Sequence, residues 1–238
     1  MDYSIIEVKE RVLADNERCA AEIRRALRAQ GVFLVNLMGS PGAGKTSVLL
    51  RLIAGLKDEF RIGVMEADVD SDVDARAVAE AGTKVVQLHT GGLCHMDADM
   101  TARGLDALGL AGLDLVFLEN VGNLVCPAEF DVGADLRMMI LSVPEGDDKP
   151  LKYPLMFTVS DVMLVNKIDT APIFDFDFEA AVSRARACNP KIRVFPVSAK
   201  TGEGFDALVE WLRRRLLCRP VGADDHIGPP FPEGGPAE

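Results

Sequence analysis

Seven short apolar runs alternate with segments of helical pattern from residue 32 onward, and this alternation limits the possible folds more than any other feature. Each run is almost continuously apolar, which is typical of a strand covered on both faces. The predicted strands are residues 32–38, 62–67, 84–89, 114–120, 137–143, 161–167 and 192–197. The predicted helices between them are residues 45–57, 72–81, 96–108, 176–187 and 204–217. The pattern predicts an α/β fold with a mainly parallel sheet of about seven strands and helices on both faces.

The two ends of the chain differ from this central part, residues 32–218, which we expect to form one domain. Residues 1–31 predict a charged amphipathic helix packed on the core, with Gly31 placed to end it. Its apolar positions include Ile5, Val8, Val12, Ile23 and Leu27. Residues 219–238 are rich in proline, glycine and acidic residues, which predicts a disordered acidic tail.

Composition and charge exclude several classes of protein. The chain is 48% hydrophobic and 26% charged, which is the balance of a globular protein. Its formal net charge of -11 argues against a nucleic-acid binder. No run approaches the roughly 20 apolar residues of a membrane span, and the acidic N-terminal segment does not match a signal peptide. We therefore expect a cytoplasmic protein without disulfides, although it has five scattered cysteines.

The segment GSPGAGKT, Gly39 to Thr46, stands between the first predicted strand and a predicted helix. It matches the eight-residue phosphate-binding loop (P-loop), whose glycines let backbone amides converge on phosphate oxygens. In such a loop Lys45 contacts the outer phosphates and the Thr46 hydroxyl binds Mg²⁺. The fold is therefore predicted to be that of a P-loop NTPase. The predicted phosphate-binding residues are Gly39, Gly42, Ala43, Gly44, Lys45, Thr46 and Ser47.

Two later segments indicate which base is bound. NKID (Asn166–Asp169) ends one predicted strand, and SAK (Ser198–Lys200) follows the next. Both resemble the guanine-reading motifs of P-loop GTPases. The Asp169 carboxylate could accept two hydrogen bonds from guanine N1 and its exocyclic amine, which adenine does not offer. We therefore expect GTP and GDP as ligands. The predicted base-reading residues are Asn166, Lys167, Asp169, Ser198, Ala199 and Lys200.

Hydrolysis of GTP would need a carboxylate beside Mg²⁺ and a group that senses the γ-phosphate. Glu119 ends the fourth predicted strand, and Gly122 is spaced to offer its backbone amide to the γ-phosphate. Asp68, after the second strand, is the other acid predicted to order Mg²⁺ or the attacking water. The predicted catalytic residues are Lys45, Asp68 and Glu119, and the predicted magnesium ligands are Thr46, Asp68 and Glu119. We interpret Asp70, Asp72 and Asp74 as solvated loop acids.

Cys94 and His95 follow the third predicted strand, and Cys126 comes four residues after Gly122. Residues just past the carboxyl ends of parallel strands line the ligand crevice of an open sheet, so two thiolates and an imidazole could gather near the nucleotide. Such a set suits Zn²⁺ in a tetrahedron or Ni²⁺ in a more planar arrangement. Spacing alone leaves the alternative open that these are free cysteines and a histidine without a metal role.

Four segments closely resemble the HypB family, the nickel-incorporation GTPases of hydrogenase maturation: GSPGAGKTS, GGLCHMDADM, ENVGNLVCPAEFDVG and SVPEGDDKPLKYP. The resemblance implies a P-loop GTPase that forms a homodimer around nucleotide and inserts nickel into [NiFe]-hydrogenase. It also implies that Cys94, His95 and Cys126 hold nickel or zinc. Two partners are implied as well, namely a small zinc-containing nickel-delivery protein and the hydrogenase large subunit.

The chain departs from that family at two points, and two other functions stay open. Before His89 it has no histidine and only one cysteine, Cys19, so we expect no nickel storage. Asp99 stands where some relatives carry a histidine, which leaves open whether it ligates a second ion. One alternative is a urease accessory-type nickel GTPase, whose Cys-Pro-His triplet is broken here by Ala128. The other is a P-loop phosphotransferase acting on a small metabolite.

Overall fold

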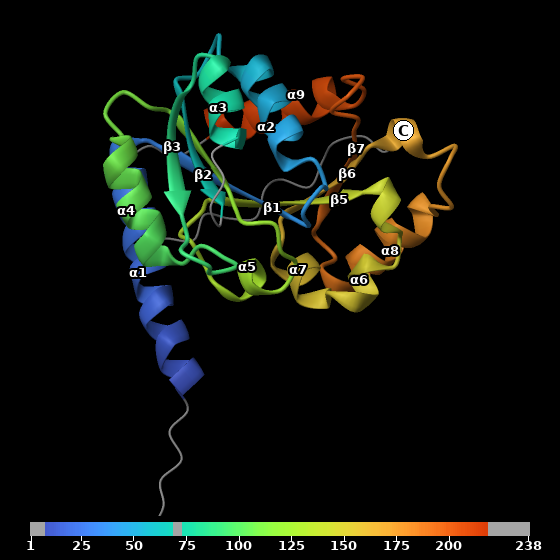
Figure 1. The fold of residues 1–238 in the computed structure, drawn as a ribbon, viewed down its shortest axis with the longest axis horizontal. Coiled ribbons are helices and arrows are strands. Elements are labelled where there is room, and N and C mark those ends of the chain that lie inside the picture. Colours follow the sequence, from blue (N-terminus) through green and yellow to red (C-terminus); the bar gives the residue numbers. More distant parts are fainter. Residues whose placement is uncertain (1–7, 69–72, 219–238) are drawn as a thin grey trace, which may run out of the picture.

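The computed structural model describes residues 8–68 and 73–218. Within these ranges it contains a seven-stranded sheet of order β3-β2-β4-β1-β5-β6-β7, in which every neighbouring pair is parallel (Figure 1). The strands are β1 (Phe33–Gly39), β2 (Ile62–Asp68), β3 (Lys84–His89), β4 (Leu115–Glu119), β5 (Leu136–Ser142), β6 (Val162–Asn166) and β7 (Arg193–Pro196). Each lies within two residues of its predicted bounds, so the predicted α/β fold with a parallel sheet is confirmed.

Helices cover both faces of the sheet, as the near-continuous apolar strands predict (Figure 1). The long helices are α1 (Val8–Gln30), α2 (Lys45–Leu56), α3 (Val73–Glu80), α4 (Ala98–Leu108), α8 (Phe178–Cys188) and α9 (Phe205–Leu217). The short helical segments are α5 (Cys126–Glu129), η1 (Val143–Glu145), α6 (Lys149–Lys152), α7 (Pro154–Val159) and η2 (Ile168–Thr170). The sequence pattern did not predict these short segments. No helix among the described residues is long and apolar enough to cross a bilayer.

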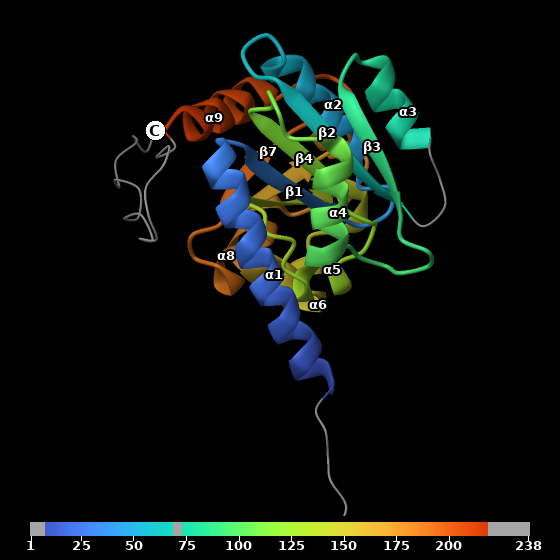
Figure 2. The same ribbon diagram turned by 90° about the vertical axis from the view of Figure 1, so that its left-hand side faces the viewer.

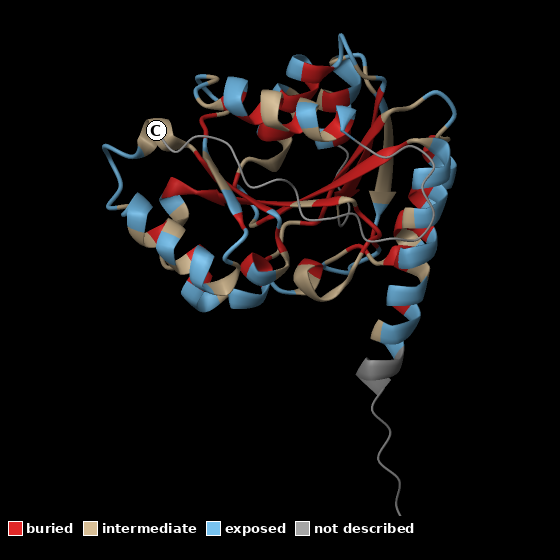
Figure 3. Ribbon diagram, turned by 180° about the vertical axis from the view of Figure 1, so that it is seen from behind, coloured by how far each residue is buried: buried red, intermediate tan, exposed pale blue. Residues whose placement is uncertain are grey.

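The central strand β1 divides the core into two layers, because successive side chains of a strand point to opposite faces. Val35 and Leu37 pack with Leu52 of α2 on the face that α9 also covers. Leu34 points the other way and packs with Leu27 of α1 and with α4. All of these side chains are fully buried, and Figure 3 shows the buried sheet between largely exposed helix surfaces.

Helix α1 packs on the core from Asn16 to its C-terminal end. Asn16 is 9% exposed, and Ala20, Ile23 and Leu27 are buried against α4 and the sheet. Val12 is 49% exposed, and the first turns of the helix extend beyond the core in Figures 1 and 2. The apolar spacing thus overestimates how much of the helix is covered. Ile5, the side chain of Val8 and the predicted tail at 219–238 lie outside the described residues.

Candidate nucleotide and metal sites

The P-loop joins the end of β1 to the start of α2, at the carboxyl edge of the sheet. Gly39 ends β1, and Lys45, Thr46 and Ser47 form the first turn of α2. Gly44 has φ 94°, and a Cβ there would lie 2.6 Å from Asn166 Nδ2. Only glycine therefore fits at this turn, since a side chain would be both strained and in collision. The backbone amides at the start of α2 form the expected anion-binding helix terminus.

Two residues of the NKID segment hold the P-loop in place. The Asn166 amide group donates to the carbonyl of Ala43 (2.9 Å) and accepts from the backbone N–H of Ala199 (3.1 Å). Lys167 Nζ donates to the carbonyl of Gly42 (2.7 Å). The side chain of Asn166 is 1% exposed, so its hydrogen bonds are fully desolvated and costly to lose. The NKID segment is therefore in contact with the phosphate loop and with the SAK segment.

Asp169 is oriented by the second base-reading segment. The buried Ser198 hydroxyl donates to Asp169 Oδ1 at 2.6 Å. Arg51 of α2, which no sequence motif pointed to, fixes the same loop by donating to the carbonyls of Ala199 (2.8 Å) and Lys200 (3.0 Å). The carboxylate predicted to read guanine thus lies in a braced position next to the P-loop.

Three acidic residues meet beneath the P-loop. Glu66, Asp74 and Glu119 each offer a carboxylate oxygen, and these oxygens lie within 4.8 Å of one another. The Thr46 hydroxyl donates to Glu119 Oε1 at 2.9 Å. Glu66 and Glu119 are each 2% exposed, and one oxygen of each lacks a hydrogen-bond partner. Buried carboxylate oxygens without partners are costly unless a proton or a cation compensates them.

The electrostatics of this pair fit a divalent cation. Burial, reinforced by the neighbouring Glu119 carboxyl, raises the pKa of Glu66 to about 10. Burial raises the pKa of Glu119 to about 7, against the opposing effect of the Lys45 ammonium and the Thr46 hydroxyl. The pair therefore keeps a proton at neutral pH when no cation is present. Mg²⁺ prefers oxygen ligands and would satisfy the partnerless oxygens, so Thr46, Glu66, Asp74 and Glu119 fit it.

The acidic group differs from the one expected from the sequence. Glu66, which was not selected, is a member, and Asp74, which we interpreted as a solvated loop acid, is another. Asp68 ends β2 and is not part of this group within the described ranges, so its role stays a prediction. Asp70 and Asp72 lie outside the described residues. A charged residue inside an apolar strand, as Glu66 is, was the signal that could have identified it.

The loop after β4 packs directly on the P-loop. A Cβ at Gly122 would lie 2.9 Å from Pro41 Cγ and 3.0 Å from its backbone nitrogen, so only glycine allows this approach. The backbone N–H of Asn123 donates to the carbonyl of Gly39 at 3.1 Å. Gly122 therefore lies directly against the P-loop, and the contact of its amide with a γ-phosphate stays a prediction.

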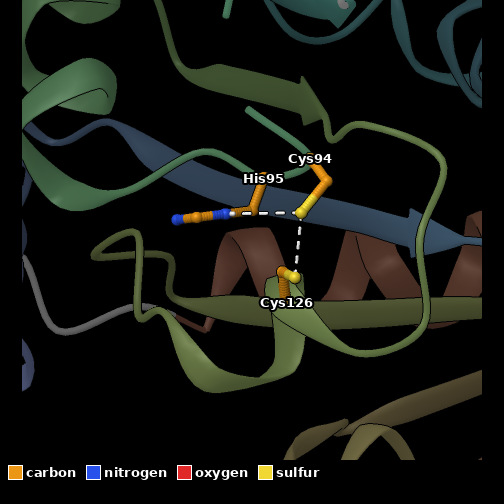
Figure 4. Close-up of side chains that lie close together, drawn as sticks. All are labelled: Cys94, His95 and Cys126. Atoms are coloured by element: carbon orange, nitrogen blue, oxygen red, sulfur yellow. Dashed lines mark hydrogen bonds between the residues drawn. The ribbon is translucent and has the colours of Figure 1, made fainter. Parts of the chain in front are cut away.

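Cys94, His95 and Cys126 lie together at the same edge of the sheet (Figure 4). Their ligand atoms are within 4.8 Å of one another; Cys94 Sγ is 2.9 Å from Cys126 Sγ and 3.9 Å from His95 Nδ1. The His95 ring stacks on Phe130, with ring centroids 4.0 Å apart. The geometry thus unites the three predicted ligands, while Asp99 in the first turn of α4 is not a member of this group in the described part.

The pKa values of His95 and Cys126 determine which protons a metal ion must displace when it binds. Burial lowers the pKa of His95, so the imidazole is neutral near pH 7 and carries a lone pair. The hydrogen bond with Cys94 raises the pKa of the Cys126 thiol, with burial adding to the effect. A metal ion that binds thiolates must displace such protons, and its affinity will rise with pH.

Asn123 connects the P-loop with both cysteine segments. Its Nδ2 donates to the carbonyl of Cys94 at 3.3 Å, and its Oδ1 accepts from the N–H of Val125 at 2.9 Å. Val125 precedes Cys126, the first residue of α5. The Asn123 backbone is in turn hydrogen-bonded to Gly39, so this one residue contacts the P-loop and both cysteine segments.

Comparisons with known proteins agree with this arrangement. The family described as CobW/HypB/UreG, nucleotide-binding domain, matches residues 33–196. The hydrogenase maturation factor HypB of Rhizobium leguminosarum bv. viciae is 45% identical over 217 residues, which cover 91% of this chain and 73% of that protein.

Two solved structures have the same fold. The hydrogenase maturation factor HypB of Archaeoglobus fulgidus has a TM-score of 0.80 and 39% identity, covering 85% of this chain and 99% of that one. HypB of Helicobacter pylori, solved in complex with nickel, has a TM-score of 0.80 and 34% identity, covering 85% and 95%. This chain therefore belongs to the HypB family of hydrogenase maturation factors, within the CobW/HypB/UreG group.

Proposed function

We propose that this chain is a GTP-hydrolysing nickel metallochaperone that inserts nickel into [NiFe]-hydrogenase, with metal binding and dimerisation controlled by the GTP state. One observation carries the proposal. Asn123 is hydrogen-bonded to Gly39 of the P-loop and to Cys94, and three residues later the chain supplies Cys126. A nucleotide site and a thiolate–imidazole site therefore share one short loop.

The nucleotide half supports GTP hydrolysis through residues of this chain. Lys45 would neutralise the outer phosphates, and the Gly122 amide would contact the γ-phosphate. Thr46, Glu66 and Glu119 would hold Mg²⁺, which spreads and neutralises the charge that develops on the transferred phosphoryl group. Asp169 would select guanine through its two-acceptor face.

The metal half supports transfer rather than permanent storage. Two thiolates and one imidazole suit nickel or zinc and leave at least one coordination position for another donor. A second copy of the chain or a nickel-delivery partner could supply that donor. Cys94 is exposed, so an incoming or outgoing ion has a route to solvent.

Coupling would act through the Gly122–Asn123 segment. Loss of the γ-phosphate would remove a contact of the Gly122 amide. The Asn123 side chain would pass the resulting shift to the Cys94 carbonyl and to the start of α5. A change in metal affinity of about 1–3 kcal/mol, typical of allosteric coupling, is enough to turn binding into release.

The test is equilibrium titration of the purified protein with nickel and with zinc, once in GDP and once in a non-hydrolysable GTP analogue, with mass measured in parallel. We expect affinity and mass to differ between the two nucleotide states, and Cys94→Ala to abolish the tight site. Equal affinity and equal mass in both states would refute the coupling. GTP consumption that rises with a small-metabolite acceptor and is unchanged in Cys94→Ala would favour the phosphotransferase instead.

A further inference from the structure

A buried side chain of α1 joins the two segments that support the metal site. Asn16 is 9% exposed, and its Nδ2 donates to the carbonyl of Asp131 at 2.9 Å. Its Oδ1 accepts from the backbone N–H of Ala98 at 2.8 Å. Ala98 lies three residues after His95, and Asp131 directly follows Phe130, on which the His95 ring stacks. One amide group therefore fixes both the backbone that carries His95 and the ring that orients it.

Asn16 acts together with other contacts of these two segments. Met96, the residue directly after His95, donates its N–H to the buried Asn120 side chain at 3.2 Å, which ties that point to β4. Between α1 and the Phe130 segment lies a cavity of about 350 Å³, whose lining includes Asn16, Pro127 and Phe130. Val132 of this segment packs in the same buried cluster as Ala20 and Ile23 of α1. The hydrogen bonds of Asn16 add to that packing where the space is unfilled.

The Asp131 end of this connection is itself well anchored. The Asp131 carboxylate pairs with Arg24 of α1 and, at 2.9 Å, with Arg137 of β5. These charges lower the pKa of Asp131 despite its burial, so the ion pairs persist across the neutral range. α1 thus contacts the Phe130 segment through the Arg24 ion pair and through packing of Ala20 and Ile23. It also contacts it through Asn16, whose side chain reaches the His95 segment as well.

We propose that Asn16 is a positioning residue for the metal site, which makes α1 part of that site although it carries none of its ligands. The proposal rests on the proposed function, since it assumes that Cys94, His95 and Cys126 bind nickel. Loss of both hydrogen bonds frees the backbone after His95 and the Phe130 ring, so the imidazole is no longer held in one orientation. Removal of groups that orient metal ligands typically weakens affinity about 10- to 100-fold.

The experiment compares three variants with the parent protein. Asn16→Leu keeps the approximate volume and removes both hydrogen bonds. Leu27→Val trims a fully buried side chain on the same helix, away from the metal segments, and controls for lost stability. Asp15→Asn removes only an exposed ion pair with Arg18 and controls for a change next to Asn16. Nickel affinity, GTP affinity, melting temperature and hydrogen exchange of the segments 94–101 and 126–133 are measured for each.

We expect Asn16→Leu to bind nickel about 10- to 100-fold more weakly, to exchange faster in both segments and to bind GTP within about twofold of the parent. Leu27→Val is expected to lower the melting temperature with nickel affinity unchanged. The inference is overturned if Asn16→Leu matches the parent in nickel affinity or in exchange, or if Leu27→Val weakens nickel binding as much. Failure of the proposed function gives a different result, because Cys94→Ala would then bind nickel as tightly as the parent does. In that case hydrogen exchange of the two segments still shows whether Asn16 holds them in place.

Discussion

Replacing Asn123 by alanine removes the side-chain connection between the nucleotide and metal sites and keeps the backbone that contacts the P-loop. Two hydrogen bonds are lost, to the Cys94 carbonyl (3.3 Å) and from the Val125 N–H (2.9 Å). The bond from the Asn123 N–H to Gly39 is retained. Each lost bond is worth about 0.5–1.5 kcal/mol net, so the free energy of unfolding should fall by about 1–3 kcal/mol.

The larger effect is expected on the coupling between the nucleotide state and the nickel affinity. In the proposed coupling, the bond to the Cys94 carbonyl would transmit a shift of the loop to a proposed metal ligand, and about 1 kcal/mol corresponds to about a fivefold change in an equilibrium constant. We therefore expect the ratio of nickel affinities in GDP and in a GTP analogue to move about fivefold towards one, with GTP affinity unchanged. Isothermal titration in both nucleotide states measures the ratio.

A matched control is available at Asn189. Its Nδ2 donates to the Ser160 carbonyl at 2.8 Å, and its Oδ1 accepts from the Lys191 N–H at 3.0 Å, the same pattern far from both sites. Asn189→Ala should cost similar stability and leave the ratio of nickel affinities as in the parent. An unaltered ratio in Asn123→Ala, or an equal change in Asn189→Ala, would refute the connection through Asn123.

Three further predictions concern single groups. Glu66 and Glu119 have raised pKa values, so the folded protein keeps protons that the unfolded chain releases. Without Mg²⁺ the free energy of unfolding should therefore fall as pH rises from 4.5 through about 7 and on towards about 10. Glu66→Gln should flatten that decline in urea unfolding series and weaken the Mg²⁺ dependence of hydrolysis. Asp169→Asn should shift nucleotide preference from GTP towards XTP in competition binding; retained GTP preference would contradict the guanine contact. Lys45→Ala should nearly abolish phosphate release from GTP and leave nickel binding intact. Cys94→Ala should abolish tight nickel binding and leave phosphate release intact. Loss of both activities in either variant would contradict separate sites.

The sequence predicted the sheet and the long helices because each element has its own periodicity, either continuous apolar runs or helical spacing. The short helices α5, α6 and α7 have no such period, and they were missed. Each nevertheless carries a proline in its first turn, at Pro127, Pro150 and Pro154, where proline favours helix initiation. That local signal was available, but where a one-turn helix packs depends on contacts that the sequence does not display.

The residues predicted to bind phosphate and base could be selected because the spacing within each motif is local, and the structure brings the motifs together while their roles stay predictions. Glu66 required a different inference, namely that an acid within a buried strand must face a cation or a partner. Asn16 offered no signal of any kind. A polar residue on an amphipathic helix normally faces solvent, and only the fold shows that this one lies between the Ala98 and Asp131 backbones.

The short distance between Cys94 and Cys126 depends on the strand order, which the sequence does not predict. Cys94 follows β3 and Cys126 follows β4, but β2 lies between these strands in the sheet, so adjacency of strand ends alone would leave the two sulfur atoms apart. The chain after β3 must cross the end of β2. Positive φ at Gly91 and Gly92 turns it, and the bond from Met96 to Asn120 at the end of β4 holds it there. The approach of the Cys94 and Cys126 thiols is therefore set by the residues that bring one loop across a strand as much as by the cysteines themselves.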